Sequence, residues 1–558
     1  MEYLIYRRSI PSQFVDIDLT LLAGKDENLE LQLPAWRPGR YELANYAQKL
    51  RSLKVTDSSG QCIPLRQYTK DRWAFTSKEE GIYCIQYQFH ASQMDAGGSW
   101  SDDEQLYINF INLAFQVIGR EEEEITVRLE LPENYKIATA LPCSDPWVLK
   151  ARGFQHLVDS PMIASATLQH FTYHVHDHSF HLWFQGEIHF DVEALIERFT
   201  NFSKAQIDAF GDFPADHYHF LFQLLPYSHY HGVEHQFSTV ITLGPAAELA
   251  NPSFMDRLMG VSSHELYHFW NVCRIRPKEL LPYDFSKEAY INSGLVAEGV
   301  TTYMGDYFLW KSGYYADRNF LDVVEKWINR EFEQFGWKNQ SIVQSSWDLW
   351  LDGYKPGIPN RKVSIYNRGA LLSLCLDLML LEKGSSLSQV MKAMWDNFGQ
   401  KGRGYELKDF QRLIANGLKD NAAAEAFFTK FVYGTDHLLP VLKDCLETAG
   451  IALDEERQDD LATDYGLILD GEAKVTSVHP ESPAYQQIMI GDAIQTQEVQ
   501  QSPEGDILNL SIKRYQRDMR VTLAKTGDAY FKRYQLSIQT ANGLRHWKDL
   551  PNDQMDTF

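Results

Sequence analysis

Val261-Ser-Ser-His-Glu-Leu-Tyr-His-Phe-Trp270 contains the pattern His264-Glu265-x-x-His268. Two residues four apart on an α-helix project from the same face, about one turn apart, so both imidazoles can reach one metal ion. Glu265 is offset around the helix, where its carboxylate can act as a general base. This arrangement is typical of zinc peptidase chemistry. The alternative interpretation is a surface helix on which two histidines share this spacing by chance.

The residues before the motif favour a helix. Asn251 stands before Pro252, a combination that is common at helix starts. Phe254, Leu258 and Val261 then recur at roughly helical spacing. We therefore expect the two histidines to lie on an amphipathic helix.

A third metal ligand is predicted in Gly294-Leu-Val-Ala-Glu-Gly-Val-Thr-Thr-Tyr303, where Glu298 interrupts an apolar stretch. A buried carboxylate is costly unless it is paired or bound to metal. With His264 and His268, Glu298 would leave the fourth zinc position for water, as a catalytic site requires. A structural zinc would favour four ligands that include cysteine, and no cysteines cluster here. We therefore expect one catalytic Zn²⁺ ion.

Length and composition limit the other classes of function. The chain has 558 residues, which predicts three or four domains, and its 44% hydrophobic content suffices for several cores. The formal net charge of −22 argues against a nucleic-acid partner, because nucleic acid needs a basic surface. An acidic surface could attract an amine-bearing substrate or serve only for solubility.

The cysteines and the N-terminus bear on the cellular compartment. The six cysteines form no Cys-x-x-Cys pair, and they are Cys62, Cys84, Cys143, Cys273, Cys375 and Cys445. We expect free thiols in a reducing compartment. The sequence begins without an apolar signal core, and no apolar run is long enough to span a membrane. We therefore expect a cytoplasmic protein with no membrane partner, or a periplasmic one if a signal peptide has been removed.

Hydrophobic periodicity divides the chain into three predicted domains. Residues 1–170 contain segments that alternate with period two and predict an all-β domain. Residues 171–452 are dominated by helical patterns and contain the metal motif. Residues 453–545 begin with a charged, linker-like segment, Asp454–Asp460, and form a third domain.

Two further segments contain candidate functional residues. In Tyr230-His-Gly-Val-Glu-His-Gln-Phe-Ser238, Gly232 precedes Glu234 and His235 near the end of a strand. An edge strand beside the cleft would present Glu234 to a free α-amino group of the substrate, and the alternative is an ordinary surface glutamate. Tyr366 lies near the start of an apolar helix, where its hydroxyl could donate to an oxyanion or only pack.

Two other segments permit a functional and a structural interpretation. The turn Pro34–Tyr41 contains two prolines and a glycine between aromatics, so it is either a rigid packed turn or a lip over the active site. His174, His176 and His178, with His181 nearby, line one face of a predicted strand. A solvated strand face is favoured there over a second metal site.

The C-terminal segment contains the elements of a PDZ-like β/α domain. These elements are a Gly-Leu turn, a Ser-Pro-Ala segment and Gly-Asp-x-Ile, found in Asp464–Leu469, Lys474–Ala484 and Ile490–Ile494. Such domains bind peptide termini by adding a strand to a sheet edge. The alternative is a small β module that only packs on the enzyme.

Together these motifs resemble the glycyl aminopeptidase family of zinc metallopeptidases, which are gluzincins in which a distant glutamate is the third ligand. The most specific matches are His264-Glu-Leu-Tyr-His-Phe-Trp-Asn-Val-Cys-Arg-Ile-Arg-Pro277, Glu298-Gly-Val-Thr-Thr-Tyr303 and Gly232-Val-Glu-His235. Tyr366-Asn-Arg-Gly369 resembles the Tyr-x-Lys-Gly motif of related aminopeptidases, and Pro34-Ala-Trp-Arg-Pro-Gly39 resembles the N-terminal turn of the family. The resemblance implies an N-terminal β domain, a thermolysin-like catalytic domain and a C-terminal PDZ domain.

The resemblance also implies a role for each site residue. Zinc would be held by His264, His268 and Glu298. Glu265 would be the base and proton shuttle. Substrate would be bound by Glu234, which anchors the α-amine, with Gly232 and His235 beside it, and Tyr366 would stabilise the oxyanion.

Three positions depart from the family pattern. His231 stands where a glycine is usual, Cys273 replaces a commonly basic residue, and Arg368 replaces lysine. We expect these changes to alter the substrate pocket while sparing the ligands and the base.

The implied activity is hydrolysis of the N-terminal peptide bond of peptides with a free N-terminus, with a small first residue such as Gly or Ala. Two alternatives remain open. One is an endopeptidase or oligopeptidase with the same zinc site, in which Glu234 does not anchor an amine. The other is an inactive PDZ-bearing protein that only binds peptides.

Overall fold

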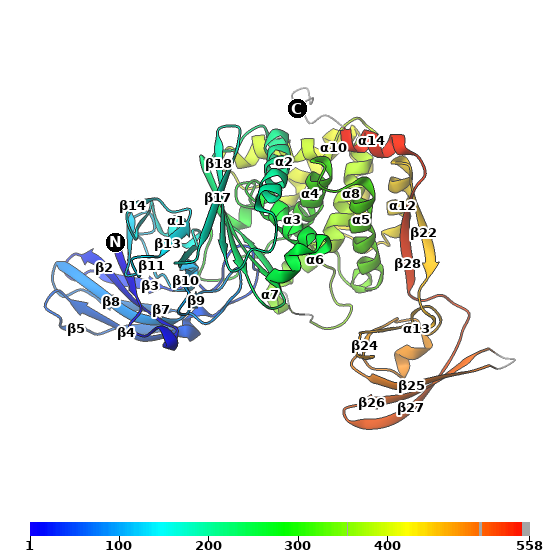
Figure 1. Cartoon of the computed structure of the whole chain (residues 1–558), viewed down its shortest axis with the longest axis horizontal. Helices are drawn as coiled ribbons and strands as arrows, with labels where there is room; N and C mark the ends of the chain where they lie inside the picture. Colours follow the sequence, from blue (N-terminus) through cyan, green and yellow to red (C-terminus); the bar gives the residue numbers. More distant parts are fainter. Residues whose placement is uncertain (354, 356, 502–504, 550–558) are drawn as a thin grey trace.

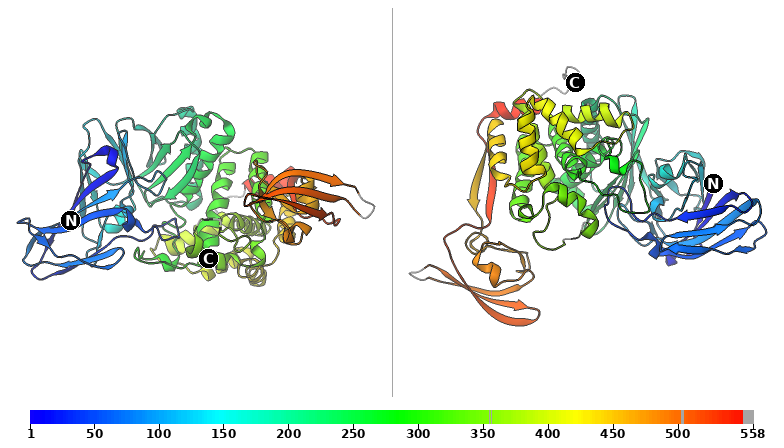
Figure 2. Two further views of the ribbon diagram at one scale, coloured as in Figure 1. Left: turned by 90° about the horizontal axis from the view of Figure 1, so that it is seen from below. Right: turned by 180° about the vertical axis from the view of Figure 1, so that it is seen from behind.

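The computed structural model describes residues 1–353, 355, 357–501 and 505–549, and it arranges them in three parts along one long axis (Figure 1). A strand-rich N-terminal part lies at one end, helices fill the middle, and a small β domain lies at the other end. The views in Figure 2 show the same order from below and from behind.

The N-terminal part is built from strands, as its period-two alternation predicts. In Gly81–His90, for example, buried and solvent-facing residues alternate along most of the strand, because successive side chains point to opposite faces of a sheet. The largest sheet here has eight strands, and its order is β14 (Cys143–Asp145), β15 (Val148–Ala151), β12 (Ile125–Leu129), β1 (Glu2–Tyr6), β2 (Phe14–Ala23), β8 (Gly81–His90), β4 (Leu50–Asp57) and β5 (Cys62–Ile63).

Two smaller sheets complete this part around the short helix α1 (Phe154–Val158). One runs in the order β13 (Lys136–Thr139), β16 (Met162–Ser165), β10 (Gln105–Ile108) and β9 (Trp100–Ser101). The other runs in the order β11 (Gln116–Val117), β3 (Asn28–Gln32), β7 (Arg72–Thr76) and β6 (Arg66–Thr69).

A five-stranded mixed sheet joins the N-terminal part to the helices. Its order is β17 (Gln169–Val175), β18 (His178–Gln185), β19 (His217–Leu224), β21 (Ser238–Gly244) and β20 (His229–Glu234). Phe220 and Phe222 belong to the large helical core, whereas Leu221 packs with N-terminal residues such as Tyr107. The sheet is therefore covered on both faces, and β20 is its edge strand, antiparallel to β21.

The helical part forms the largest core of the protein. Helix α8 is buried on nearly every side, which explains its continuous apolar sequence. The helices are α2 (Val192–Phe210), α3 (Pro252–Tyr267), α4 (Thr301–Lys311), α5 (Asp317–Phe332), α6 (Ile342–Trp347), α7 (Leu349–Asp352), α8 (Asn367–Leu381), α9 (Leu387–Met394), α10 (Leu407–Leu418), α11 (Asn421–Phe427) and α12 (Leu439–Thr448). A π-helical segment, η6 (Leu295–Val300), leads directly into α4.

The C-terminal domain is connected through two strands that pair with each other. β22 (Ile451–Arg457) and β28 (Lys532–Ile538) run antiparallel, and both contribute to the helical core together with Trp547 of α14 (Ala541–Asp549). The separate small core lies between them, within residues 465–523. It is formed by α13 (Asp460–Tyr465), β23 (Leu467–Leu469), β24 (Val475–Val478), β25 (Ala493–Gln500), β26 (Ile507–Arg514) and β27 (Arg517–Ala524).

Two predictions about the whole chain can be compared with the structure. All six cysteines are free thiols. Among the described helices, none is both long enough and apolar enough to cross a bilayer.

Candidate metal centre and active site

The predicted metal helix is formed as the sequence indicates. Pro252 is its first residue, and the Asn251 side chain caps it by accepting a hydrogen bond from the Ser253 amide at 3.1 Å. His264 lies in the last turn of α3, and His268 follows at its C-terminal end.

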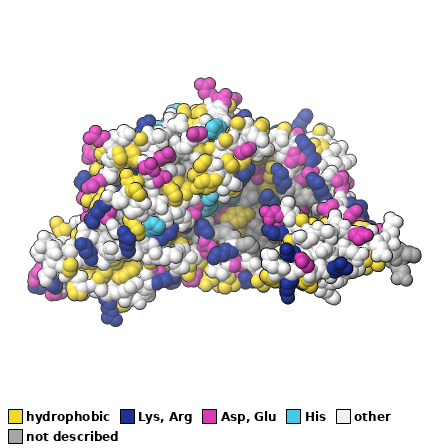
Figure 3. Space-filling view, turned by 60° about the horizontal axis from the view of Figure 1, so that its bottom comes forward, with side chains coloured by type: hydrophobic (Ala, Val, Ile, Leu, Met, Phe, Trp, Pro, Cys, Tyr) yellow, Lys and Arg dark blue, Asp and Glu magenta, His cyan; other side chains and the backbone are white. Residues whose placement is uncertain are grey.

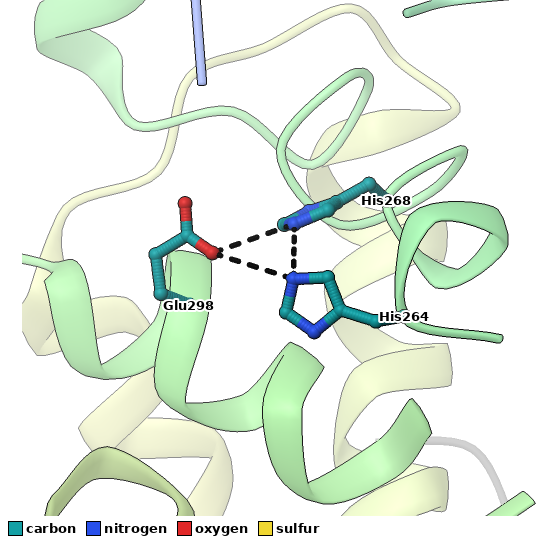
Figure 4. A group of neighbouring side chains, drawn as sticks. All are labelled: His264, His268 and Glu298. Carbon is teal, nitrogen blue, oxygen red and sulfur yellow. Dashed lines mark hydrogen bonds and ion pairs between the residues drawn. The ribbon is translucent and has the colours of Figure 1, made fainter. Parts of the chain in front are cut away.

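Three side chains converge at this end of α3. His264 Nε2 lies 3.0 Å from His268 Nε2, and Glu298 Oε2 lies 3.7 Å and 3.4 Å from these two nitrogens. Figure 4 shows the three groups pointing toward one another. His264 comes from the last turn of α3, His268 from the residue after its end, and Glu298 from η6. The ligand atoms of a tetrahedral zinc lie roughly 3.4 Å apart, so one ion fits between them.

Asn271 fixes the orientation of both ligand-bearing segments. Its backbone carbonyl accepts a hydrogen bond from His268 Nδ1 at 2.7 Å, so that in the neutral ring the lone pair is on Nε2, toward the centre. Its side-chain amide donates to the carbonyl of Val296 at 2.7 Å and to the hydroxyl of Thr301 at 2.9 Å. Asn271 therefore ties the loop after α3 to the segment that carries Glu298.

The electrostatics of the centre favour a cation. Burial raises the pKa of Glu265 well above its usual range, and the nearby carboxylates of Glu234 and Glu298 raise it further. Burial opposes charge on His268, but the carboxylates of Glu298 and Glu234 outweigh it and raise the pKa of His268 to about 10. Burial lowers the pKa of His264, which is therefore neutral, as a metal ligand must be.

Unsatisfied oxygen atoms also indicate a metal site. Glu298 Oε2, Glu265 Oε2 and Glu234 Oε1 are all buried and make no hydrogen bond to the described residues. Buried polar atoms are rarely left without a partner, because each one carries a desolvation cost. Two imidazole nitrogens and a carboxylate oxygen are also the donor set of catalytic zinc sites. The residues present therefore fit a zinc ion.

We expect Asn271→Ala to weaken zinc binding about ten-fold, because ligand-orienting partners typically contribute ten- to a hundred-fold to metal affinity. The measurement is a competition titration against a chromophoric chelator. Asn329→Ala is the matched control, because that amide also donates two hydrogen bonds, to the carbonyls of Glu325 and Tyr534, but links α5 to β28. Equal zinc affinity in all three proteins would show that the Asn271 amide does not support the centre.

The edge strand β20 lies directly against Glu265. A β-carbon added at Gly232 would come within 2.2 Å of Glu265 Oε1. Gly232 therefore permits the strand to approach α3 closely, and it leaves the edge of β20 beside the base. Glu234, on the same face two residues later, is the last residue of the strand, as the sequence predicts.

His235 does not reach the cavity. Residues alternate along a strand, so His235 faces the opposite side from Glu234, and its Nδ1 lies 3.0 Å from Asp159 Oδ1. His235 therefore does not line the cavity in which a substrate would lie.

The turn Pro34–Tyr41 of the N-terminal part closes the end of the cavity near Glu234. A β-carbon added at Gly39 would come within 2.4 Å of Glu234 Oε2. Gly39 and Arg40 also line the cavity wall. The structure therefore favours the lip over a turn that is only packed, although Trp36 and Tyr41 of the same segment are also buried.

His231 lies on the same wall, as expected for a position that departs from the family pattern. Burial and the Arg37 guanidinium lower the pKa of His231 to about 3, so its ring is uncharged at neutral pH. The other two departures lie outside the cavity. Cys273 is buried, and Arg368 pairs with the buried carboxylate of Glu331 at 2.7 Å. Neither residue therefore lines the cavity directly.

Tyr366 lies beside the metal centre at the start of α8. Its ring centroid is 6.4 Å from that of His264, and its hydroxyl donates a hydrogen bond to Glu298. Gly369, one turn further along α8, packs against Gly299 so closely that an added β-carbon would come within 2.5 Å of the Gly299 Cα. This contact brings the Glu298 segment and Tyr366 together.

The three proposed metal ligands, Glu265, Glu234 and Tyr366 all open into one cavity of about 800 Å³. The space-filling view shows a recess near the middle of the molecule, with acidic and basic side chains along its rim (Figure 3). Residues that the sequence alone did not indicate also line the cavity, among them Asp95, Asp256, Arg257, Thr302, Asp306, Tyr315, Lys326 and Arg330. Helical spacing could have indicated Arg257, because it lies two turns before His264 on α3.

The row of histidines on β17 and β18 does not form a second metal cluster in the described part of the chain. His176 pairs with Asp208, and His178 contacts the carbonyl of Ala215. His181 lies between His170 and His217, and burial lowers its pKa to about 4. These rings therefore form hydrogen bonds along the sheet surface, in agreement with the structural interpretation.

Comparisons with known proteins agree with this architecture. Residues 2–166 match the Peptidase M61 N-terminal domain, and residues 257–372 match the M61 glycyl aminopeptidase model. No curated protein matches the chain. An aminopeptidase N family protein from Idiomarina loihiensis has a similar structure, with a TM-score of 0.88 and 24% identity over 98% of this chain and 99% of that chain. An M1 zinc metallopeptidase from Deinococcus radiodurans has a TM-score of 0.48 and 16% identity over 78% of this chain and 94% of that chain.

The two matched domains together cover half of the sequence, and the second contains the whole metal centre described above. The fold of the Idiomarina loihiensis protein extends over nearly the full length of both chains. The chain belongs to the M61 glycyl aminopeptidase family of peptidases.

Proposed function

We propose that this protein is a zinc-dependent aminopeptidase that removes one small residue, Gly or Ala, from the N-terminus of peptides. The observation that carries the proposal is a single cavity that contains the metal centre, the base Glu265 and the carboxylate of Glu234. The metal centre supplies the chemistry, and Glu234 would select the N-terminal bond.

One zinc ion would be held by His264, His268 and Glu298. Their ligand atoms lie close together, and Glu298 Oε2 has no hydrogen bond to the described residues. When bound, zinc supplies Lewis acidity that polarises a carbonyl and lowers the pKa of water. The buried carboxylate of Glu265 would accept a proton from the attacking water and later pass it to the leaving amine. The Tyr366 hydroxyl would turn from Glu298 to donate to the oxyanion that develops on the substrate.

Glu234 would bind the α-ammonium group of the substrate. Its carboxylate is buried, lies beside Glu265, and has an oxygen without a hydrogen bond to the described residues. A charge-assisted hydrogen bond from an ammonium group would satisfy it. The Gly39 turn closes the cavity immediately beyond Glu234, which supports an exopeptidase over the endopeptidase alternative. The preference for Gly or Ala is proposed from the family to which the chain belongs.

The C-terminal domain would bind peptide termini as a PDZ-like module. The Gly-Leu turn at Gly466 leads into β23, which pairs only with β24 within the described residues. Its other edge is therefore available for an added strand. The alternative of an inactive peptide-binding protein is disfavoured, because the ligands, Glu265 and Tyr366 all converge in the cavity.

The test measures zinc content together with hydrolysis of Gly- and Ala-p-nitroanilide, each with a free and an acetylated N-terminus. We expect one zinc per chain and activity that needs the free amine and is lost on chelation. Equal cleavage of the acetylated substrates would favour the endopeptidase. Bound zinc without any peptide cleavage would favour the binding protein.

We expect Tyr366→Phe to lower kcat for Ala-p-nitroanilide by about 100-fold and to change KM little, because the hydroxyl acts mainly on the charge of the transition state. The measurement is steady-state kinetics at saturating zinc. Tyr315→Phe is the matched control, because Tyr315 lines the same cavity but its hydroxyl is hydrogen-bonded to Asp306, which is not one of the proposed metal ligands. A similar kcat for both variants would remove Tyr366 from the oxyanion site.

A further inference from the structure

The cavity continues beyond the metal centre into a trough between three helices. Arg257, Val261 and His264 lie on one face of α3, because these spacings bring side chains back to the same side of a helix. Thr302 and Asp306 extend the face that begins at Glu298. The opposite wall belongs to α5 and is lined by Asn319, Asp322, Val323, Lys326, Trp327 and Arg330.

The carboxylates of this trough already have partners. Asp256 accepts a hydrogen bond from the Tyr314 hydroxyl at 2.7 Å. Asp322 pairs with Arg318 at 2.7 Å, outside the trough. Asp306 is hydrogen-bonded to Tyr315, and burial raises the pKa of Asp306 to about 7, which reduces its negative charge near neutral pH.

The cations of the trough have no such partners. Arg257, Lys326 and Arg330 make no direct ion pair or hydrogen bond with the described residues, and only Lys326 is near enough to the Asp306 carboxyl to lower its pKa. The Arg257 guanidinium lies over the rings of Tyr230 and Phe254, at 4.9 Å and 4.7 Å from their centroids. Stacking holds the guanidinium in place and leaves its N–H groups free to bind an anion.

The trough lies where the downstream end of a peptide substrate would run. A peptide whose amine is held by Glu234, at the C-terminal end of β20, can extend only toward Tyr230, because Gly39 closes the other direction. It would lie antiparallel to this edge strand, as in other cases of strand addition. Tyr230 is also the ring on which Arg257 rests.

The number of peptide residues that fit can be estimated from two lengths, one along β20 and one along α3. Glu234 and Tyr230 are four residues apart on a strand, which is roughly 13 Å at about 3.3 Å per residue. Arg257 precedes His264 by seven residues on α3, which is roughly 10 Å at 1.5 Å per residue. An extended peptide covers about 3.3–3.6 Å per residue, so three or four residues fill this distance.

We propose that Arg257, supported by Lys326 and Arg330, binds the C-terminal carboxylate of a tripeptide or tetrapeptide. The inference rests on the proposed function, because Glu234 sets the direction of the chain. A guanidinium can bind a carboxylate through two parallel hydrogen bonds, which adds geometric selectivity to the charge attraction. The cleft would then hold both ends of a short peptide and prefer free oligopeptides to the N-termini of proteins.

The experiment compares Ala-Ala-Ala with its C-terminal amide and extends the series from two to six alanines. We expect kcat/KM to peak at three or four residues and to fall about ten- to a hundred-fold on amidation, as for the loss of one charged hydrogen-bonding partner. In Arg257→Gln the peak and the preference for the acid should disappear. Hydrolysis of Ala-p-nitroanilide, which has no carboxylate, is the reference rate to which the acid and the amide are both compared in each protein.

Arg198→Gln is the matched control, because Arg198 is also half-buried and stacks on a tyrosine, Tyr314, but does not line the cavity. Binding of the acid and the amide to zinc-loaded Glu265→Gln protein is measured by calorimetry in parallel. If Ala-p-nitroanilide is hydrolysed but the acid and the amide behave alike in both assays, the carboxylate site is refuted and the aminopeptidase remains. If no substrate is hydrolysed, the aminopeptidase fails, and calorimetry alone decides whether the carboxylate is bound.

Discussion

Glu265→Gln is expected to lower kcat for Ala-p-nitroanilide by about 10³-fold, within the range of 10²–10⁴ that positioned general bases contribute. Glutamine has the same shape but cannot accept the proton of the attacking water. Glu265 is not one of the three groups that would hold zinc, so the metal should stay bound. The measurement is kcat together with zinc content by atomic emission.

The control for this substitution is Glu333→Gln. Glu333 is another carboxyl whose pKa is raised by burial, and it lies after α5 outside the cavity. Its replacement should leave kcat and zinc content unchanged. If Glu265→Gln kept more than a tenth of wild-type kcat with zinc bound, the base would have to be another group in the cavity.

Local patterns in the sequence were sufficient to predict the centre of this site. The spacing of His264 and His268 is a property of one helix, and a carboxylate in an apolar stretch is costly wherever it lies. The end of a strand likewise predicts the position of Glu234. Each of these arguments needs only the residues of a single element.

The walls of the cavity could not be predicted in this way. Gly39 reaches Glu234 because a turn of the N-terminal part packs on the central sheet, more than 190 residues away in sequence. Lys326 and Arg330 reach the trough because α5 lies opposite α3, which no periodicity in either helix indicates. For the same reason the sequence does not show that Arg368 is buried against Glu331. Contacts between distant elements depend on packing that the local sequence does not specify.

The local sequence also does not predict how the C-terminal domain is connected to the helical part. The charged segment 454–460 is typical of a linker, but its first residues continue β22, which pairs with β28. Leu453 and Leu536 bury their side chains in the helical core. The chain thus leaves this core and returns to it, and only the pairing of two strands about 80 residues apart shows this.

Glu234→Gln is expected to lower kcat/KM for Ala-p-nitroanilide by about 100-fold or more, because truncating one partner of a buried charge pair costs about 2–5 kcal/mol. The wild-type protein should discriminate strongly against acetyl-Ala-p-nitroanilide, since an acetylated nitrogen has no charge to satisfy Glu234. In the variant the uncharged glutamine amide can hydrogen-bond to either substrate. The ratio of kcat/KM for the free substrate to that for the acetylated substrate should therefore fall toward one. The measurement is therefore the ratio of kcat/KM for the free and the acetylated substrate.

This ratio separates an amine anchor from a group that only supports the fold. A structural defect at the end of β20 would lower both rates together and leave the ratio unchanged. His231→Gln is the matched control, because His231 lies on the same strand and lines the same cavity but is uncharged at neutral pH, so its replacement should preserve the ratio. A Glu234→Gln protein that still rejected the acetylated substrate would place the amine elsewhere, and the direction assigned to the peptide along β20 would then have to be reversed or abandoned.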